Sequence, residues 1–199
     1  MVRSKGSVVF FATGNVNKFK EARKVLDKFG ISVGMLRVKS VEIQSDSLEE
    51  VVRASIVDAF GRCRRPIFVE DAGLFVDGLN GFPGPYAAYV YKTLGNAGLL
   101  KLMENVEARG ARFESVLAYL SKELRAPVCF SGSVAGKVAL SEGRKTGQGG
   151  FGFDPVFIPD GSTKTFAEMS VEEKNQVSHR AKALRKFAEW YTSLCRSGF

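Results

Sequence analysis

The sequence has few of the residues that build disulfide frameworks, zinc sites or membrane spans. Among its 199 residues are three cysteines and one histidine. Cys63, Cys129 and Cys195 are far apart and form no CxxC pair, so we interpret them as reduced packing residues. No stretch approaches the roughly 20 consecutive apolar residues of a membrane helix, and the first residues lack the apolar core of a signal peptide. We therefore expect a cytoplasmic protein without a membrane partner.

The chain also lacks the two commonest nucleotide-binding motifs, GxxxxGK[ST] and GxGxxG. It does carry an excess of positive charge, with 29 Lys and Arg against 21 Asp and Glu and a net charge of +8. An anionic ligand is expected from this excess. The basic residues are dispersed, and only Arg62, Arg64 and Arg65 cluster, whereas nucleic-acid surfaces usually show a basic stripe. This pattern favours a small anionic ligand over a nucleic acid.

Hydrophobic periodicity predicts an α/β fold. Apolar runs typical of strands occupy residues 8–12, 35–38, 67–69, 113–120, 128–139 and 155–158. Helical spacing follows Asn15, and Ser47 with Glu50 and Ser170 with Glu173 form capping-box patterns at the starts of two further helices. We expect Gly61 to end the second helix. The order of elements predicts a central mixed, elongated sheet flanked by helices, in one domain (residues 1–199) of two lobes with a ligand-binding cleft between them.

A candidate anion site lies between the first strand and the first helix. Thr13, Gly14, Asn15 and Lys18 stand where helix N–H groups and the positive end of the helix dipole favour phosphate. Lys18 adds a charge, and Thr13 and Asn15 add hydrogen-bond donors. An N-cap turn with a surface lysine explains the same residues equally well.

A candidate metal site follows the third strand. Glu70 and Asp71 come directly after the apolar run 67–69, and open α/β sheets place ligands at such strand ends. Mg²⁺ takes a few carboxylate oxygens together with water and phosphate, so Asp71 with Glu42 from elsewhere would suffice. A solvated acidic turn is the alternative.

Two further segments carry polar and aromatic residues that suit a base. Glycines flank Phe151 and Phe153, and Asp154 follows, so rings for stacking and a carboxylate lie close together, although core packing explains the rings as well. Ser178 is expected to cap the last helix, which places His179 and Arg180 in its first turn. Cations there oppose the helix dipole, and an anionic or polar ligand would compensate. A structural histidine is the alternative.

Taken together, these segments resemble the inosine triphosphate pyrophosphatase family, also called dITP/XTP pyrophosphatases. The likeness rests on five motifs in the family's order and spacing, and it covers almost the whole chain. The motifs are Thr13-Gly14-Asn15 through Lys18 to Glu21, Glu42-Ile43-Gln44, Val69-Glu70-Asp71-Ala72-Gly73 with Gly81-Phe82-Pro83-Gly84, Gly150-Phe151-Gly152-Phe153-Asp154-Pro155, and Phe166 through Lys174 to Ser178-His179-Arg180.

The resemblance implies that the protein hydrolyses inosine or xanthosine triphosphates to the monophosphate and pyrophosphate. It implies Mg²⁺ on Glu42 and Asp71, and Asp71 or Glu70 as the group that activates water. It also implies a homodimer. The residues implied to bind the substrate are Thr13, Gly14, Asn15, Lys18 and Ala72 for the triphosphate, and Phe151, Gly152, Phe153, Asp154, Lys174, Ser178, His179 and Arg180 for the base.

Three positions depart from the family pattern. Ala72 stands where many relatives have a hydroxyl residue, and Ser55 and Ala88 stand where some carry lysine, so fewer phosphate contacts are expected. Two other functions remain open. One is a Maf-like pyrophosphatase of modified pyrimidine nucleotides, and the other is a nucleic-acid-binding protein without catalysis, although acidic residues in its groove would repel a polyanion.

Overall fold

The computed structural model describes residues 8–38, 40–41, 43–144 and 150–196. Its strands form one open sheet in the order β2-β1-β3-β5-β6-β7, with β4 paired to β3. The strands are β1 (Val9–Ala12), β2 (Val33–Leu36), β3 (Ile67–Val76), β4 (Pro83–Gly84), β5 (Gly110–Leu120), β6 (Val128–Val138) and β7 (Phe157–Pro159). The α-helices are α1 (Val16–Asp27), α2 (Leu48–Cys63), α3 (Ala87–Thr93), α4 (Gly95–Leu102), α5 (Val171–Val177) and α6 (His179–Arg196).

The sheet is mixed, as the sequence predicts. Strand β1 runs parallel to both β2 and β3, whereas β3 with β4 and β6 with β7 are antiparallel pairs. Helices alternate with the parallel strands because a parallel connection needs a crossover. The predicted fold class, a mixed sheet flanked by helices, is confirmed.

The chain divides into two compact units. Unit 1 comprises residues 1–71, 116–131 and 180–199, and unit 2 comprises residues 72–115 and 132–179. Strands β3, β5 and β6 cross the boundary along the chain, so each unit holds one part of each strand.

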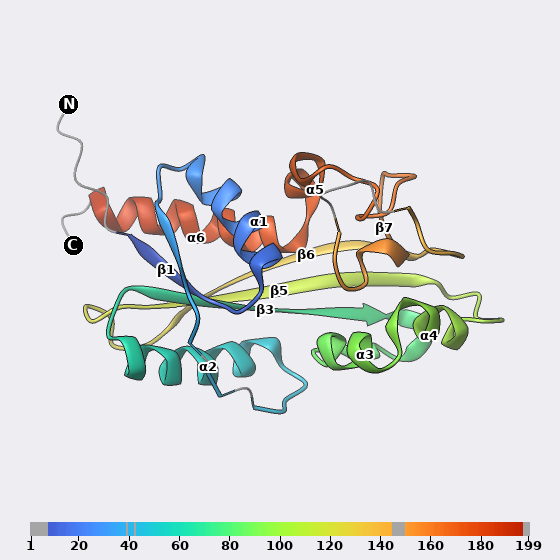
Figure 1. Cartoon of the computed structure of the whole chain (residues 1–199), viewed down its shortest axis with the longest axis horizontal. Helices are drawn as coiled ribbons and strands as arrows, with labels where there is room; N and C mark the ends of the chain where they lie inside the picture. Colours follow the sequence, from blue (N-terminus) through green and yellow to red (C-terminus); the bar gives the residue numbers. More distant parts are fainter. Residues whose placement is uncertain (1–7, 39, 42, 145–149, 197–199) are drawn as a thin grey trace. The chain divides into compact units, whose positions relative to one another are not determined.

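Unit 1 has its own apolar core, built from α1, α6 and the strands that they cover. Figure 1 shows α1 and α6 on one face of these strands and α2 on the other. Phe11 and Phe68 stack with ring centroids 4.4 Å apart, and Phe187 of α6 packs against Phe68 at 5.6 Å. These rings are fully buried, which fixes α6 against the sheet.

Unit 2 has a second core of buried residues from β3, β5, β6, α3, α4 and the segment around β7. Phe113 of β5 lies edge-to-face on Phe157 at 4.8 Å and stacks on Phe166 at 6.0 Å. Each of these two clusters of buried residues thus belongs to one unit.

Several element boundaries differ from the prediction. Strand β2 ends at Leu36 rather than 38, and residues 155–156 belong to a short 3-10 helix before β7. Helix α2 continues through Gly61 to Cys63, because Arg64 in the left-handed conformation (φ 52°) ends it instead. Residues 110–120 and 128–138 form neighbouring strands, as expected.

The three cysteines are free, but none of them is fully buried, and Cys195 is exposed. The expectation of packing residues is therefore wrong for Cys195, which lies near the C-terminal end of α6. Within the described ranges, no helix combines the length and apolar character that a membrane crossing needs.

Candidate functional site

The turn between β1 and α1 is an N-cap. Asn15 has extended backbone angles, and its side-chain oxygen accepts hydrogen bonds from the N–H groups of Asn17 (2.9 Å) and Lys18 (3.1 Å). Thr13 accepts a bond from the Asn15 N–H at 3.1 Å. Both oxygens therefore act as acceptors that order the turn, and Gly14 is exposed beside them. Asn15 is therefore an N-cap residue, as one of the two interpretations of this turn states. The same interpretation is wrong about Lys18, which is not an exposed surface lysine.

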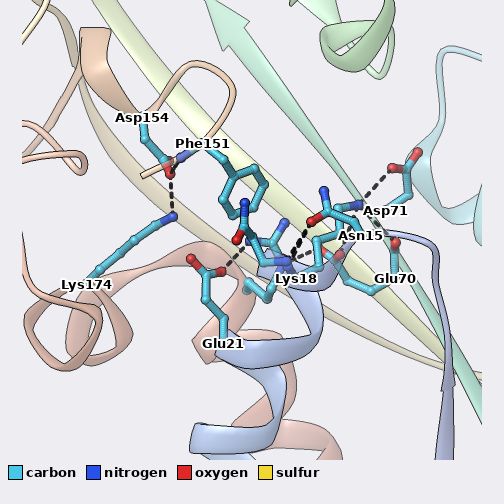
Figure 2. A network of polar contacts seen from close by, with 10 residues as sticks. Asn15, Lys18, Glu21, Glu70, Asp71, Phe151, Asp154 and Lys174 are labelled. Carbon is cyan, nitrogen blue, oxygen red and sulfur yellow. Dashed lines mark hydrogen bonds and ion pairs between the residues drawn. The ribbon is translucent and has the colours of Figure 1, made fainter. Parts of the chain in front are cut away.

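Lys18 points back toward the sheet and lies between two carboxylates (Figure 2). Its Nζ is 3.1 Å from Oε2 of Glu70 and 3.5 Å from Oδ1 of Asp71, and it donates to the Glu70 carbonyl oxygen at 3.2 Å. Only 18% of the Lys18 side chain is exposed. The structure thus brings together three of the residues that the sequence singled out.

The acidic pair lies within β3 and not at its end, which corrects the sequence-based expectation. Strand β3 runs from Ile67 to Val76 because the residues after the pair, from Leu74 onward, pair with β4. Its partner β1 reaches only as far as Phe68. Glu70 and Asp71 therefore follow the carboxyl end of β1 while remaining inside an extended strand.

The two neighbouring carboxylates have different exposures. Only 1% of the Glu70 side chain is exposed, against 34% for Asp71. Successive strand residues point to opposite faces, which accounts for the difference. Asp71 is therefore the carboxylate of the pair that is accessible to a solvent-borne ligand.

In proteins, Mg²⁺ is commonly held by one or two carboxylates together with water and substrate phosphate. Asp71 supplies one accessible carboxylate. Glu42, the expected second ligand, lies outside the described residues. In the part of the chain that the structure describes, no group of three or more His, Cys, Asp and Glu side chains is placed to hold a metal.

Arg180 lies in the first turn of α6 and is buried, with two carboxylates beside it. Its Nη1 donates to Oε2 of Glu21 at 2.6 Å, and its Nε is 3.1 Å from Oε1 of Glu70. Burial lowers the pKa of Arg180, but the charges of Glu70 and Glu21 outweigh it, so the pKa is raised above its usual value. Glu21 and Glu70 thus offset the unfavourable interaction between this cation and the positive end of the helix dipole. We refer to Lys18, Glu21, Glu70, Asp71 and Arg180 as the Lys18 cluster.

A second cluster of polar and aromatic groups lies in unit 2. Oδ2 of Asp154 accepts hydrogen bonds from the Phe151 N–H at 2.7 Å and from Nζ of Lys174 at 2.6 Å (Figure 2). Lys174 is 2% exposed, and its ammonium lies 4.8 Å from the Phe151 ring centre and 5.4 Å from that of Phe166. The carboxylate and the two rings together stabilise a buried cation. We refer to Phe151, Asp154, Phe166 and Lys174 as the Lys174 cluster.

Three of the other predicted base-binding residues in unit 2, Phe153, Ser178 and His179, are buried. Phe153 is 3% exposed and meets Tyr91 edge-to-face at 5.5 Å, which favours the packing role that the sequence left open. His179 stacks on Phe113, with ring centres 4.7 Å apart and an angle of 11°. Ser178 is buried. It is the C-cap residue of α5, and it also directly precedes α6, which the sequence expected it to cap.

Gly150 packs closely against the backbone of Ala167. Its φ is +85°, and a Cβ at this position would lie 2.7 Å from the Cα of Ala167. Gly152 also has a positive φ of +61° but faces open space. Only glycine satisfies both requirements at residue 150, which sets the path of the chain into Phe151.

The three departures from the family pattern differ in their surroundings. Ser55 is buried in α2 and donates to the Val41 carbonyl oxygen at 2.9 Å. Ala88 is exposed on α3, and Ala72 is partly buried in β3. The Ser55 hydroxyl thus binds the backbone of the protein itself.

Glu21 is the charged residue that the sequence-based site omitted. It is 6% exposed, and its carboxylate points from α1 to Arg180. The signal was its spacing, because Glu21 falls three and four residues from Lys18 and Val25, on the helix face that is buried. A buried carboxylate requires a partner, and Arg180, which lies 159 residues away in the sequence, is one.

The chain is similar in sequence to known proteins. The sequence model of the Ham1 family matches residues 9–190. The chain belongs to the Ham1 family. Among curated Ham1 relatives, a "dITP/XTP pyrophosphatase" of Methanopyrus kandleri is 50% identical over 92% of this chain and 95% of its own. One of the same name from Thermococcus kodakarensis is 51% identical over 90% and 95%.

Solved structures of Ham1 proteins share the fold. The Coxiella burnetii HAM1 protein superposes with a TM-score of 0.79 at 25% identity, covering 94% of this chain and 99% of its own. A nucleoside-triphosphatase or dITP/XTP pyrophosphatase from Mycobacterium abscessus gives 0.68 at 30% identity, covering 90% and 98%.

Proposed function

We propose that this Ham1 protein hydrolyses non-standard purine nucleoside triphosphates, namely ITP, dITP and XTP, to the monophosphate and pyrophosphate. The observation that carries the proposal is the Lys18 cluster, with a cation held 3.1 Å and 3.5 Å from two carboxylates of β3. Relatives that are about half identical over at least nine-tenths of the chain bear the name dITP/XTP pyrophosphatase. The alternative functions explain neither finding.

In this proposal the Lys18 cluster binds the triphosphate and supports attack on it. Lys18 holds phosphate oxygens by charge, and the Asn15 cap fixes the helix end that carries it. Asp71 and Glu42 would hold Mg²⁺, which would supply positive charge to offset that of the phosphate oxygens. Asp71 orients a water molecule and accepts its proton, because it is the accessible carboxylate of the pair. Attack on the α-phosphorus releases pyrophosphate.

We assign selection of the base to the Lys174 cluster and His179. A site that donates hydrogen bonds to a 6-keto oxygen loses them against the 6-amino group of adenine, and such a loss typically costs about 1–3 kcal/mol. The buried ammonium of Lys174 and the imidazole of His179 are donors of this kind. Guanine shares the 6-keto group, so its rejection depends on contacts near position 2.

A cytoplasmic location and a homodimer complete the proposal. Both rest on the resemblance to the pyrophosphatase family. Sedimentation velocity tests the assembly, because a homodimer has about twice the monomer mass of 21.7 kDa.

The direct test measures product release from ITP, dITP, XTP, ATP, GTP and dTTP, with and without Mg²⁺, and assays pyrophosphate and orthophosphate separately. We expect pyrophosphate from ITP, dITP and XTP in the presence of Mg²⁺ only. Preference for modified pyrimidine nucleotides would indicate the Maf-like activity instead. Absence of turnover together with steeply salt-dependent oligonucleotide binding would indicate a nucleic-acid-binding protein.

A further inference from the structure

Residues 165–168 of unit 2 form a turn that is closed by its own end residues. Oε2 of Glu168 accepts hydrogen bonds from the Thr165 N–H at 2.8 Å and from the Thr165 hydroxyl at 2.9 Å. The Glu168 N–H donates in return to the Thr165 carbonyl oxygen at 3.1 Å. Thr165 itself is 3% exposed. These three bonds therefore fix the two fully buried residues between the ends, Phe166 and Ala167.

The turn contacts the Lys174 cluster at three points. The Phe166 ring centre lies 5.4 Å from the Lys174 ammonium. The Ala167 N–H donates to the Asp154 carbonyl oxygen at 3.3 Å. Ala167 also packs against Gly150, which leads directly into the aromatic segment of the cluster. The positions of the ammonium, the carboxylate and that segment therefore all depend on the turn.

The Glu168 carboxylate also holds the chain that precedes the cluster. The Arg144 N–H donates a hydrogen bond to it. A Cβ on the neighbouring Gly143 would collide with the Thr165 hydroxyl and lie 3.0 Å from the Glu168 carboxyl carbon. The Thr165 N–H and hydroxyl, with the Arg144 N–H, hold the pKa of Glu168 below its ordinary value of 4.5. An ionised carboxylate therefore joins two segments of unit 2, and hydrogen bonds to an ionised acceptor are the stronger kind.

We propose that Glu168 is a positioning residue for recognition of the base. It fixes the turn 165–168, and the turn fixes the ammonium of Lys174 and the carboxylate of Asp154 through Phe166 and Ala167. Glu168 thus acts through the groups that meet the base. This inference rests on the proposed function, in which the Lys174 cluster selects the base.

A positioning role and a purely structural role lead to different measurements. Loss of a structural contact lowers the free energy of unfolding but leaves the selectivity of the folded protein unchanged. Loss of positioning displaces donors from the 6-keto oxygen, so it lowers kcat/KM for ITP more than for ATP, which has no such oxygen. It also weakens the binding of IMP. Pyrophosphate has no base, so its binding stays as in the wild type.

The experiment compares the wild type with Glu168→Ala. We expect the ITP-to-ATP ratio of kcat/KM to fall about 10- to 100-fold, since a displacement of about 1 Å is enough to cost about 100-fold. IMP binding, measured by calorimetry, should weaken by a similar factor, with pyrophosphate binding unchanged. Glu104→Ala is the matched control, because it removes a carboxylate from an exposed position of unit 2 and should leave all three quantities unchanged.

Two further variants separate positioning from loss of the fold. Glu168→Gln should stay close to the wild type, because its amide oxygen is able to accept both bonds from Thr165. Thr165→Val removes only the hydroxyl donor from a side chain of nearly the same shape. It should lower the ITP-to-ATP ratio and weaken IMP binding by a smaller factor than Glu168→Ala, and it decides the question if Glu168→Ala does not fold.

Three results would overturn the inference. The first is a wild-type ITP-to-ATP ratio with wild-type IMP binding in folded Glu168→Ala, or in Thr165→Val if Glu168→Ala does not fold. The second is equal weakening of IMP and pyrophosphate binding, and the third is a loss in Glu168→Gln as large as in Glu168→Ala. A wild type that binds IMP without hydrolysing ITP contradicts the proposed function instead, and IMP binding then still decides the role of Glu168. A wild type that binds no IMP overturns both.

Discussion

At the scale of single residues, the surroundings of a charge decide what it can do. Glu70 and Asp71 are chemically similar neighbours, yet one is enclosed by Lys18 and Arg180 and the other is one-third exposed. An enclosed carboxylate orients the groups around it. An accessible one is able to meet metal and water. The functional difference between the two therefore follows from the alternation of the strand.

Asp71→Asn should abolish most turnover while leaving the fold intact. Loss of a general base typically lowers the rate about 10²- to 10⁴-fold. Because Asp71 is partly exposed, its charge contributes little to stability, and solvent screens its contact with Lys18. Pyrophosphate release from ITP and urea unfolding of the same preparation measure the two effects.

Glu70→Gln is the matched comparison for that prediction. Its carboxylate is buried against two cations, so its loss should also destabilise the protein by about 3–5 kcal/mol. Near-wild-type turnover in Asp71→Asn would refute the role of Asp71 in catalysis.

Asp154→Asn should destabilise unit 2 strongly. The change leaves the Lys174 ammonium buried without its carboxylate, which typically costs about 3–5 kcal/mol. Lys164→Met is the control, because it breaks an ion pair with Glu173 whose two side chains are about half exposed, and such pairs contribute about 0–1 kcal/mol. Equal unfolding midpoints for the two variants in urea would contradict the prediction.

At the scale of elements, side-chain caps fix where helices begin. Asn15 caps α1, Ser47 caps α2, and Ser170 with Glu173 forms a complete capping box on α5. Two of these helices carry a residue of the clusters described above, Lys18 on α1 and Lys174 on α5. The caps therefore also determine which helical turn presents each lysine.

The capping box of α5 should make stability depend on pH. The Ser170 N–H, together with Lys164, holds the pKa of Glu173 below its ordinary value of 4.5. A carboxyl with a lowered pKa stabilises the fold above its unfolded pKa, and this contribution is lost as the pH falls through the folded pKa. Glu173→Gln should thus be less stable than the wild type near neutral pH and equally stable well below 4.5.

Ser170→Ala gives the control for the capping box. Removing the cap oxygen should cost about 1 kcal/mol, and part of the loss should persist at low pH because the hydroxyl does not titrate. Urea unfolding across the pH range measures both variants. A stability gap for Glu173→Gln that grows as the pH falls would contradict the assignment.

At the scale of the whole molecule, two apolar cores share three strands. Strands β3, β5 and β6 each contribute residues to both units. If one unit unfolds, the other therefore loses part of the strands that they share. We thus expect the complete chain to unfold in one cooperative transition.

Phe157→Ala tests this cooperativity. Phe157 is fully buried in the core of unit 2, and its truncation should cost about 3–5 kcal/mol. The single tryptophan, Trp190, packs against the core of unit 1. Its fluorescence should report the lowered midpoint although the mutation lies in the other unit, and it should coincide with circular dichroism. A Trp190 transition that keeps its wild-type midpoint would show that the units unfold separately.

Local patterns predicted the elements of this fold well, because hydrophobic spacing and caps act over a few residues. They placed α1, α2, α5 and the mixed sheet correctly. They stopped β3 at the acidic pair, because two adjacent charges are typical of a strand end, whereas the structure continues the strand to its pairing with β4 at Leu74 and Phe75. The Glu21–Arg180 contact spans 159 residues, and its partner was not identifiable from helical spacing alone.

The stacking of His179 on Phe113 has a spectroscopic consequence. The chain contains one histidine, so a protein labelled at histidine gives a single set of imidazole resonances that needs no assignment by mutation. The nearly parallel Phe113 ring, 4.7 Å away, shields that imidazole and shifts its proton signals upfield. Any ligand that displaces either ring moves these signals. The unmodified chain therefore carries an intrinsic magnetic-resonance probe beside the core of unit 2.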